Sequence, residues 1–350
     1  MKMITYAEYT NVGERENNED SIKSVYSEKI GYSFVVADGL GGHGRGEDAS
    51  KFTVDTFEEE FTMDNKNNKD EAVNEKKDLE NKLNNGSTEE IKATVEDEIT
   101  GSTEGIKATV EDEKLESAEN KEDDCEEELT KNEEKMNDIS GTESIKDAEE
   151  IADVIGEMRS FDKAQYLKES FEKSQKKLEI EQDKTGGVNE LKTTAVALTI
   201  QENKAMWGHI GDSRLYVFNK NKVVLRTLDH SVPQMLVFAG EIKEKKIRKH
   251  PDRNRLLRVL GARNVELKVD YSEEYNIDDC QAFLLCTDGF WECITEKKMC
   301  KFLKKSKSVE EWLEMMAKEV RKNGMGHNMD NNSAIAVWVK DNKRSGRLWM

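Results

Sequence analysis

The strongest constraint on the fold is the uneven distribution of charged and aromatic residues along the chain. Residues 64–150, a quarter of the 350 residues, contain 30 acidic and 12 basic side chains, whereas the rest of the chain contains 43 acidic and 42 basic ones. The same window contains none of the 24 aromatic residues. A segment with so much charge and so little apolar surface cannot form a core. We therefore predict a disordered acidic insertion at 64–150 within one globular domain made of residues 1–63 and 151–340, followed by a tail at 341–350.

An internal repeat lies inside this acidic insertion. Gly86–Glu98 and Gly101–Glu113 are identical at 12 of 13 positions, and a degenerate third copy begins at Gly141. Repeats can build a solenoid, but each full copy offers only one Ile, one Val and one Ala for stacking. We favour a duplication within a disordered segment, in which Ser87 and Glu90 would cap a transient helix. The insertion would then act as a cation buffer or a docking arm.

Several classes of protein are disfavoured by the whole chain. The start, MKMITYAEYT, lacks the apolar stretch of a signal peptide, and runs such as Ala282–Cys286 are far below the roughly 18 apolar residues of a membrane span. The five cysteines show no paired metal-ligand spacing and fit free thiols in a reducing compartment. The acidic insertion repels phosphate backbones, so nucleic acid is not an expected partner. We predict a cytoplasmic, monomeric protein without a membrane span.

Strand and helix patterns alternate in the globular part. Tyr32–Ala37 predicts a buried strand that ends in a turn at Asp38-Gly39, and the apolar stripe of Glu47–Phe61 predicts a helix, as does the pattern between Ile151 and Leu178. Further strands are expected at Thr193–Ile200, Ala205–Ile210, Arg214–Phe218, Val223–Leu228, Val265–Val269, Phe283–Cys286 and Ser333–Val339, and helices at Val232–Ala239, Glu296–Leu303 and Val309–Asn323. Strands so close together favour antiparallel pairing, so the fold class is α+β.

Acidic residues recur at the ends of these predicted strands. Asp38, Asp212 and Asp288 each follow an apolar run, and Asp330 directly precedes the last one. A single Asp-Gly after a strand is usually only a turn. Four such residues in one domain can converge, however, and clustered carboxylates repel each other unless a cation neutralises them. Oxygen ligands of this kind suit Mg²⁺ or Mn²⁺ rather than zinc.

A basic residue near such a cluster would complete an anion site. The polar loop Gly13–Asp20, GERENNED, contains Arg15 close to Glu19 and Asp20. Arginine suits phosphate because its planar guanidinium donates two parallel hydrogen bonds. Taken alone, Arg15 would more simply be an exposed surface residue.

These segments, in their order along the chain, resemble the motif series of the metal-dependent protein phosphatases, the PPM or type 2C Ser/Thr phosphatases, and the compact bacterial form most of all. The matching segments are GERENNED, VVADGLGGHGRGE at Val35–Glu47, TTAVALTI at Thr193–Ile200, GHIGDSRLYVF at Gly208–Phe218, DHSVPQMLVFAGEI at Asp229–Ile242, RNRLLRVLGA at Arg253–Ala262, LLCTDGFWE at Leu284–Glu292 and DNNSAIAV at Asp330–Val337. The resemblance implies two packed antiparallel β-sheets flanked by α-helices, with a binuclear Mn²⁺ or Mg²⁺ centre at one end.

The resemblance also implies a role for each matching residue. Asp38 would bridge two metal ions, the Gly39 carbonyl and the carboxylates of Asp288 and Asp330 would complete the set, and Asp212 would help to hold a third, weaker ion. Glu19 and Asp20 match acidic positions beside the centre, and Arg15 matches the phosphate-binding arginine. The implied reaction is hydrolysis of phosphoserine and phosphothreonine by a water that bridges the metals, with Arg15 and the metals stabilising the developing charge.

Two positions depart from the family pattern. Leu40 stands where eukaryotic members place a histidine proposed as general acid, and Glu292 stands where an aspartate is more usual, which would weaken or reshape the third metal site. His43 is an alternative proton donor, although its Gly-rich surroundings favour a loop role. The remaining histidines, His209, His230, His250 and His327, show no metal-like spacing and are assigned to packing or to the surface.

The resemblance implies partners as well. These are phosphorylated Ser/Thr proteins and a cognate Ser/Thr kinase with its substrates. The segment Asp229–Ala262 resembles a flap over the active site, and its Lys243, Lys245, Lys246, Arg248 and Lys249 would attract acidic phosphopeptides or form a solvated helix face. The alternative function is a catalytically silent phosphoprotein-binding regulator, which would be expected to lack some metal carboxylates; none is missing here.

Overall fold

The computed structural model describes residues 2–40, 45–63, 161–187 and 190–341. The predicted insertion at 64–150 with its repeats, His43, the helical pattern of 151–160 and the tail beyond 341 lie outside these residues. The described residues on both sides of the insertion belong to one compact unit.

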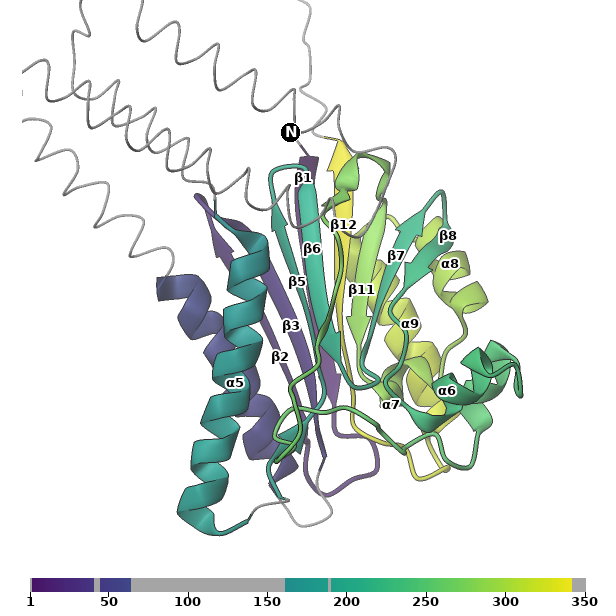
Figure 1. The fold of residues 1–350 in the computed structure, drawn as a ribbon. Helices are drawn as coiled ribbons and strands as arrows, with labels where there is room; N and C mark the ends of the chain where they lie inside the picture. Colours follow the sequence, from purple (N-terminus) through teal and green to yellow (C-terminus); the bar gives the residue numbers. More distant parts are fainter. Residues whose placement is uncertain (1, 41–44, 64–160, 188–189, 342–350) are drawn as a thin grey trace, which may run out of the picture. The chain divides into compact units, whose positions relative to one another are not determined.

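Two antiparallel sheets form the centre of this unit (Figure 1). The first sheet contains, in spatial order, β1 (Lys2–Asn11), β12 (Asn332–Asp341), β11 (Ala282–Cys286), β7 (Arg214–Asn219) and β8 (Lys222–Arg226). The second contains β10 (Tyr275–Asn276), β6 (Lys204–Ile210), β5 (Ala195–Gln201), β3 (Gly31–Leu40) and β2 (Asp20–Ser27), with β4 (Lys192–Thr193) paired to β3 and β9 (Asp270–Tyr271) paired to β6. This arrangement confirms the predicted α+β fold of two antiparallel sheets.

The sheets pack face to face because their central strands are apolar on both sides. In β3, Phe34 and Val36 point into the core between the sheets, whereas Val35 and Ala37 point to the outer face. In β11, Phe283 and Leu285 point into the same inner core. This explains why both strands appear in the sequence as continuous apolar runs rather than as an alternating pattern.

Helices cover both outer faces (Figure 1). Residues 46–63 and α5 (Lys163–Thr185) pack on the second sheet, where Phe57 and Phe171 meet edge to face at 5.0 Å. The first sheet is covered by α8 (Glu296–Lys305) and α9 (Val309–Gly324), whose buried Trp312 packs on Phe218. Asp162 caps the start of α5 by accepting from two backbone amides, and Gly186 ends it in the left-handed conformation. No helix in the described ranges is long and apolar enough to span a bilayer.

The connections correct two of the expectations. Val265–Val269 is not a strand; the chain runs in an irregular course there and pairs with β6 only at β9. Asp38-Gly39 is not a turn after a strand, because β3 continues to Leu40, where Gly39 and Leu40 pair with β4. Short helices complete the fold: α6 (Val232–Phe238), η1 (Glu244–Lys249), η2 (Ile277–Asp279) and α7 (Asp288–Trp291).

Candidate metal centre

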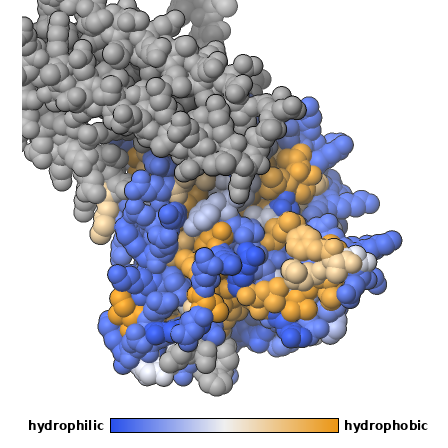
Figure 2. Space-filling model, in the orientation of Figure 1, coloured by the Kyte–Doolittle hydropathy of each residue, from blue (hydrophilic) through white to orange (hydrophobic). Residues whose placement is uncertain are grey.

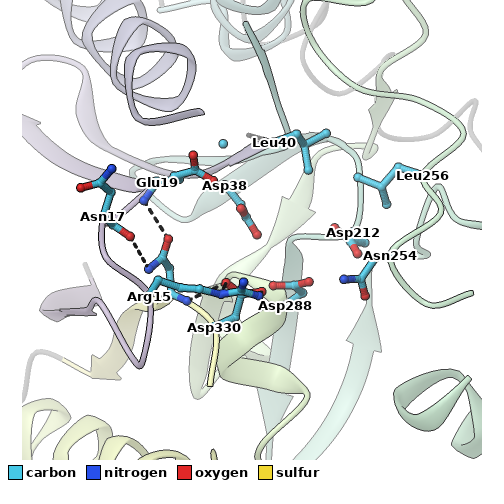
Figure 3. Close-up of a pocket in the computed structure, with 12 residues that line it drawn as sticks. Arg15, Asn17, Glu19, Asp38, Leu40, Asp212, Asn254, Leu256, Asp288 and Asp330 are labelled. Carbon is cyan, nitrogen blue, oxygen red and sulfur yellow. Dashed lines mark hydrogen bonds and ion pairs between the residues drawn. The ribbon is translucent and has the colours of Figure 1, made fainter. Parts of the chain in front are cut away.

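A cavity of about 390 Å³ opens at the end of the two sheets where β3, β6 and β11 finish and β12 begins (Figure 3). Arg15, Glu19, Asp38, Gly39, Asp212, Asp288 and Asp330 line it, together with Asn17, Leu40, Asn254, Leu256 and Asn331. Of the eight residues that the sequence marks as site residues, seven therefore share one cavity, and Asp20 lies beside it, opposite Asp38 in the register of β2 and β3.

The main chain around Asp38 is held firmly. The carbonyl oxygen of Asp38 accepts from the Thr194 amide and from the Thr193 hydroxyl, both at 2.8 Å, and the Gly39 amide donates to the Glu19 carbonyl at 3.0 Å. A side chain at Gly39 would be impossible, because its Cβ would lie 2.0 Å from the carbonyl oxygen of Gly46. The glycine thus brings the start of helix 46–63 close to the end of β3.

Three of the carboxyl groups that line the cavity have raised pKa values. Burial, followed by the charges of Asp20 and Asp288, raises the pKa of Asp38 well above its ordinary range. Burial and the charge of Asp288 do the same to the pKa of Asp212, and burial and Asp330 raise the pKa of Asp288 to about 6. Such a cluster carries unfavourable repulsion that a bound cation would relieve.

Asp20 supplies a second sign that a cation belongs here. One oxygen of its buried carboxyl accepts from the Thr287 hydroxyl at 2.9 Å, whereas the other, Oδ1, is buried without a hydrogen-bond partner among the described residues. Burial raises the pKa of Asp20 to about 8, against the opposing effect of the nearby Ser333 and Thr287 hydroxyls. A buried carboxylate oxygen without a partner is costly unless it meets a proton or a metal.

Arg15 reaches the cavity from the loop between β1 and β2. Its Nε and Nη2 donate to the two carboxylate oxygens of Asp330 at 2.9 and 2.8 Å, so that Asp330 holds the planar guanidinium at the cavity wall (Figure 3). The loop approaches closely because Gly13 has φ +67°, and a Cβ there would lie 2.3 Å from the Asp330 carbonyl oxygen. Arg15 remains partly accessible to solvent, with 43% of its side chain exposed.

Asn331 fixes this loop and was not recognised from the sequence. Its amide group donates to the carbonyls of Val12 and Asn17 at 2.8 and 2.9 Å, and its Oδ1 accepts from the Glu19 amide at 2.8 Å. The residue thereby places both Arg15 and Glu19. Its position next to Asp330 was the available signal, but an asparagine before a strand is more often only a turn former.

The flap segment contributes Asn254 and Leu256 to the cavity, which the sequence did not single out. Next to them, Arg253 pairs with Glu292, Nε to Oε1 at 2.9 Å, and Glu292 has a pKa raised to about 7 by burial and by Asp288. Glu292 thus forms an ion pair with the flap segment and is not among the residues that line the cavity.

The basic cluster of the flap divides into two parts. Lys243, Lys245, Lys246 and Lys249 are exposed, whereas Arg248 is half-buried and donates to the Trp291 carbonyl and to Glu296, both at 2.8 Å. Two hydrophobic side chains of the neighbouring helix α6, Met235 and Phe238, are more than half exposed. Hydrophobic residues also reach the surface in several places on the face drawn in Figure 2. The attraction of acidic phosphopeptides to the four lysines stays a prediction.

Comparison with known proteins agrees with this architecture. The family model described as protein phosphatase 2C matches residues 9–332. The serine/threonine phosphatase stp of Listeria welshimeri is 30% identical over 147 residues, which are 42% of this chain and 57% of that protein, so the match spans little more than half of that relative. Among solved structures, the phosphatase Stp1 of Staphylococcus aureus has a TM-score of 0.62 at 18% identity, covering 97% of this chain and 96% of that one. The catalytic domain of the phosphatase PstP in complex with two manganese ions has a TM-score of 0.57 at 18% identity, covering 97% and 100%.

Proposed function

This chain belongs to the protein phosphatase 2C family, and from that premise we propose that it is a metal-dependent protein-serine/threonine phosphatase. The observation that carries the proposal is the convergence of Asp38, Asp212, Asp288 and Asp330 on one cavity, with Arg15 on its wall. The relatives named above are serine/threonine phosphatases, which supports the same reaction.

The donors of the cavity fit hard divalent cations. All of the candidate metal ligands are oxygen atoms. Burial and the nearby carboxylates raise the pKa values of Asp38, Asp212 and Asp288, and Asp20 has a buried oxygen without a hydrogen-bond partner among the described residues. We propose that Asp38, the Gly39 carbonyl, Asp288 and Asp330 hold two Mn²⁺ or Mg²⁺ ions, with Glu19 and Asp20 beside them and Asp212 at a third, weaker site. The manganese-containing structural neighbour supports this choice of ion.

When bound, such ions would lower the pKa of a water nucleophile and polarise the phosphoryl group. The chain itself would bind and orient the phosphate through the guanidinium of Arg15, whose fork matches two phosphate oxygens once it turns from Asp330. The Asn331 amide would keep Arg15 and Glu19 in place during this exchange. Leu40 lines the cavity without a proton to donate, so the leaving group must take its proton from elsewhere.

The partners that we propose follow from the reaction: proteins phosphorylated on Ser or Thr, and a kinase that produces them. We further propose a cytoplasmic monomer in which the 64–150 insertion does not take part in catalysis. A catalytically silent phosphoprotein-binding regulator is not favoured, since every expected carboxylate is present in the cavity or beside it.

The test is hydrolysis of an aryl phosphate and of a phosphothreonine peptide by the full chain with Mn²⁺, with Mg²⁺ and with a chelator. Turnover should require the metal, and Asp38→Asn and Asp288→Asn should each lower kcat about 10³-fold or more, because several kcal/mol of charge stabilisation are lost. Asp279→Asn, at an exposed position of η2, is the matched control. Activity retained in both cavity variants, or phosphopeptide binding without turnover, would refute the proposal.

A further inference from the structure

Outside the cavity, the fold brings two histidines, His209 and His230, into contact. His209 lies on β6, opposite Asp270 of β9, and His230 comes directly before Ser231, the N-cap of the flap helix α6. Both histidines are buried, and their rings stack with centroids 4.7 Å apart at an interplanar angle of 20°. With Asp270 they form a cluster whose ligand atoms all lie within 4.8 Å of one another. The cluster therefore has the composition of a metal site.

Its hydrogen bonds nevertheless indicate a different role. The Gly211 amide donates to Nδ1 of His230 at 3.2 Å, so in the neutral ring the proton sits on Nε2, which lies 3.0 Å from a carboxylate oxygen of Asp270. Nε2 of His209 lies 2.8 Å from the Leu228 carbonyl, which can only accept, so this nitrogen donates. Three of the four ring nitrogens thus already have protein partners, and burial lowers the pKa of His230, which favours its neutral form.

His230 holds the turn that presents Asp212 to the cavity. In addition to the bond to Nδ1, the backbone amide of His230 donates to the Gly211 carbonyl at 2.8 Å, so both polar groups of Gly211 are bound by one residue. Gly211 has φ +99°, and a Cβ there would lie 2.5 Å from the Thr194 side chain. The next carbonyl, that of Asp212, accepts from the Trp291 indole at 3.0 Å. The main chain on both sides of the Asp212 side chain is therefore fixed.

The same residue also holds the flap segment that lines the cavity. The His230 carbonyl accepts from the Leu257 amide at 2.8 Å, and the neighbouring Ser231 forms an isolated β-bridge with Leu256. Leu256 and Asn254 are the two flap residues of the cavity wall. Asp270, the partner of the His230 ring, also accepts from Arg258 at 2.8 Å, which ties the far end of this segment to β9.

We propose that His230 is a positioning residue that clasps the Asp212 turn to residues 254–257 of the flap segment and so sets two neighbouring parts of the cavity wall (Figure 3). The clasp depends on an acceptor at the position of Nδ1, because the Gly211 amide would otherwise be buried without a partner. The proposal rests on the proposed function in one respect, that Asp212 serves as a metal ligand.

The test compares three substitutions with different acceptors. In His230→Asn the side-chain oxygen lies near the position of Nδ1, in His230→Gln the oxygen lies near that of Nε2, and in His230→Phe the ring shape remains without an acceptor. We expect the Gln and Phe variants to raise the Mn²⁺ concentration needed for half-maximal turnover about 10-fold, as loss of supporting hydrogen bonds does in metal sites. The Asn variant should stay near the parent, as should the control Asp279→Asn at an exposed position of η2.

A second readout is independent of turnover. Hydrogen exchange at the Gly211 amide should be slow in the parent and in His230→Asn, and faster in His230→Gln. The comparison of the Asn and Gln variants tests the proposed role of His230 even if the Phe variant does not fold. Equal Mn²⁺ dependence and equal Gly211 exchange in the Asn and Gln variants would overturn the clasp. So would a bound metal ion that calorimetry detects in the parent and that both His230→Asn and Asp270→Asn lose, since the cluster would then be a metal site. A parent without metal-dependent hydrolysis would refute the proposed function alone, because the exchange measurement needs no activity.

Discussion

Two regions near the ends of the central strands contain buried charged groups. In one region these groups are paired with opposite charges, and in the other most of them are not. Around Arg214, each charged group meets a partner: Asp229 accepts from Arg214 at 2.7 and 2.6 Å and from Arg226 at 3.1 Å, and Arg214 stacks over Trp291 with its guanidinium carbon 3.4 Å from the ring centroid. Around Asp38, carboxyl groups face one another, and Arg15 is the only cation among the described residues that line the cavity.

The difference separates a structural charge network from a site made for a ligand. In the Arg214 network the protein supplies the neutralising charge itself, so the folded chain gains nothing further by binding an ion. In the cavity the described residues supply only Arg15 against several carboxyl groups, and burial together with the charges of neighbouring carboxylates raises the pKa values of Asp38 and Asp212. Buried ionisable groups therefore indicate function only where their partners inside the fold do not balance them.

The largest effect on stability should come from breaking the balanced network. Asp229→Ala would leave Arg214 buried and unpaired, which costs about 3–5 kcal/mol of unfolding free energy. Urea unfolding measures this loss. Glu244→Ala, which removes the exposed partner of Arg226, is the control and should cost less than about 1 kcal/mol. Equal effects of the two substitutions would show that Arg214 finds another partner or water.

A smaller effect of opposite sign is expected in the cavity. In metal-free protein, Asp38→Asn should raise the unfolding free energy by about 1 kcal/mol at neutral pH, because it keeps the shape of a carboxyl group whose ionisation is opposed by burial and by the neighbouring carboxylates. A carboxyl whose pKa is raised by folding destabilises the fold where it is ionised in the unfolded chain. The gain should therefore vanish as the pH falls below the ordinary aspartate pKa of about 4.

Thermal unfolding after chelation, repeated across pH, measures this gain, and adding Mn²⁺ should stabilise the parent more than the variant. The control Asp279→Asn should leave both quantities unchanged. A cavity variant that is less stable than the parent in the metal-free state at neutral pH would show that Asp38 is balanced within the fold after all.

The sequence predicted the central strands and the acidic residues at their ends, because both depend on local patterns: apolar runs such as Phe283–Cys286 and the Asp residues beside them. It indicated only that these ends can converge, and their meeting in one cavity follows from the pairing of the strands. It did not predict β1, whose ten residues pair in register with β12 at the opposite end of the chain, Lys2 opposite Asp341. Nor did it reveal Asn331 or His230, because their importance lies in contacts with Asn17, Glu19 and Gly211 that no spacing along the chain encodes. Long-range pairing decides such roles, and it follows from the packed fold rather than from local propensity.

The smallest effect should come from the most acidic part of the sequence. Replacing residues 64–150 by a short flexible linker removes 30 acidic side chains, yet we expect unfolding free energy to change by less than about 0.5 kcal/mol and aryl-phosphate turnover at a given free Mn²⁺ concentration to stay the same. The expectation follows from the sequence: if the window is disordered as predicted, its carboxylates keep their water and need no cation, whereas those of the cavity are held together by the fold. Metal titrations of the two proteins, with free Mn²⁺ buffered, measure the difference. A large loss of stability or turnover would show that the window packs on the domain, and a shifted Mn²⁺ dependence would show that it supplies ligands of its own.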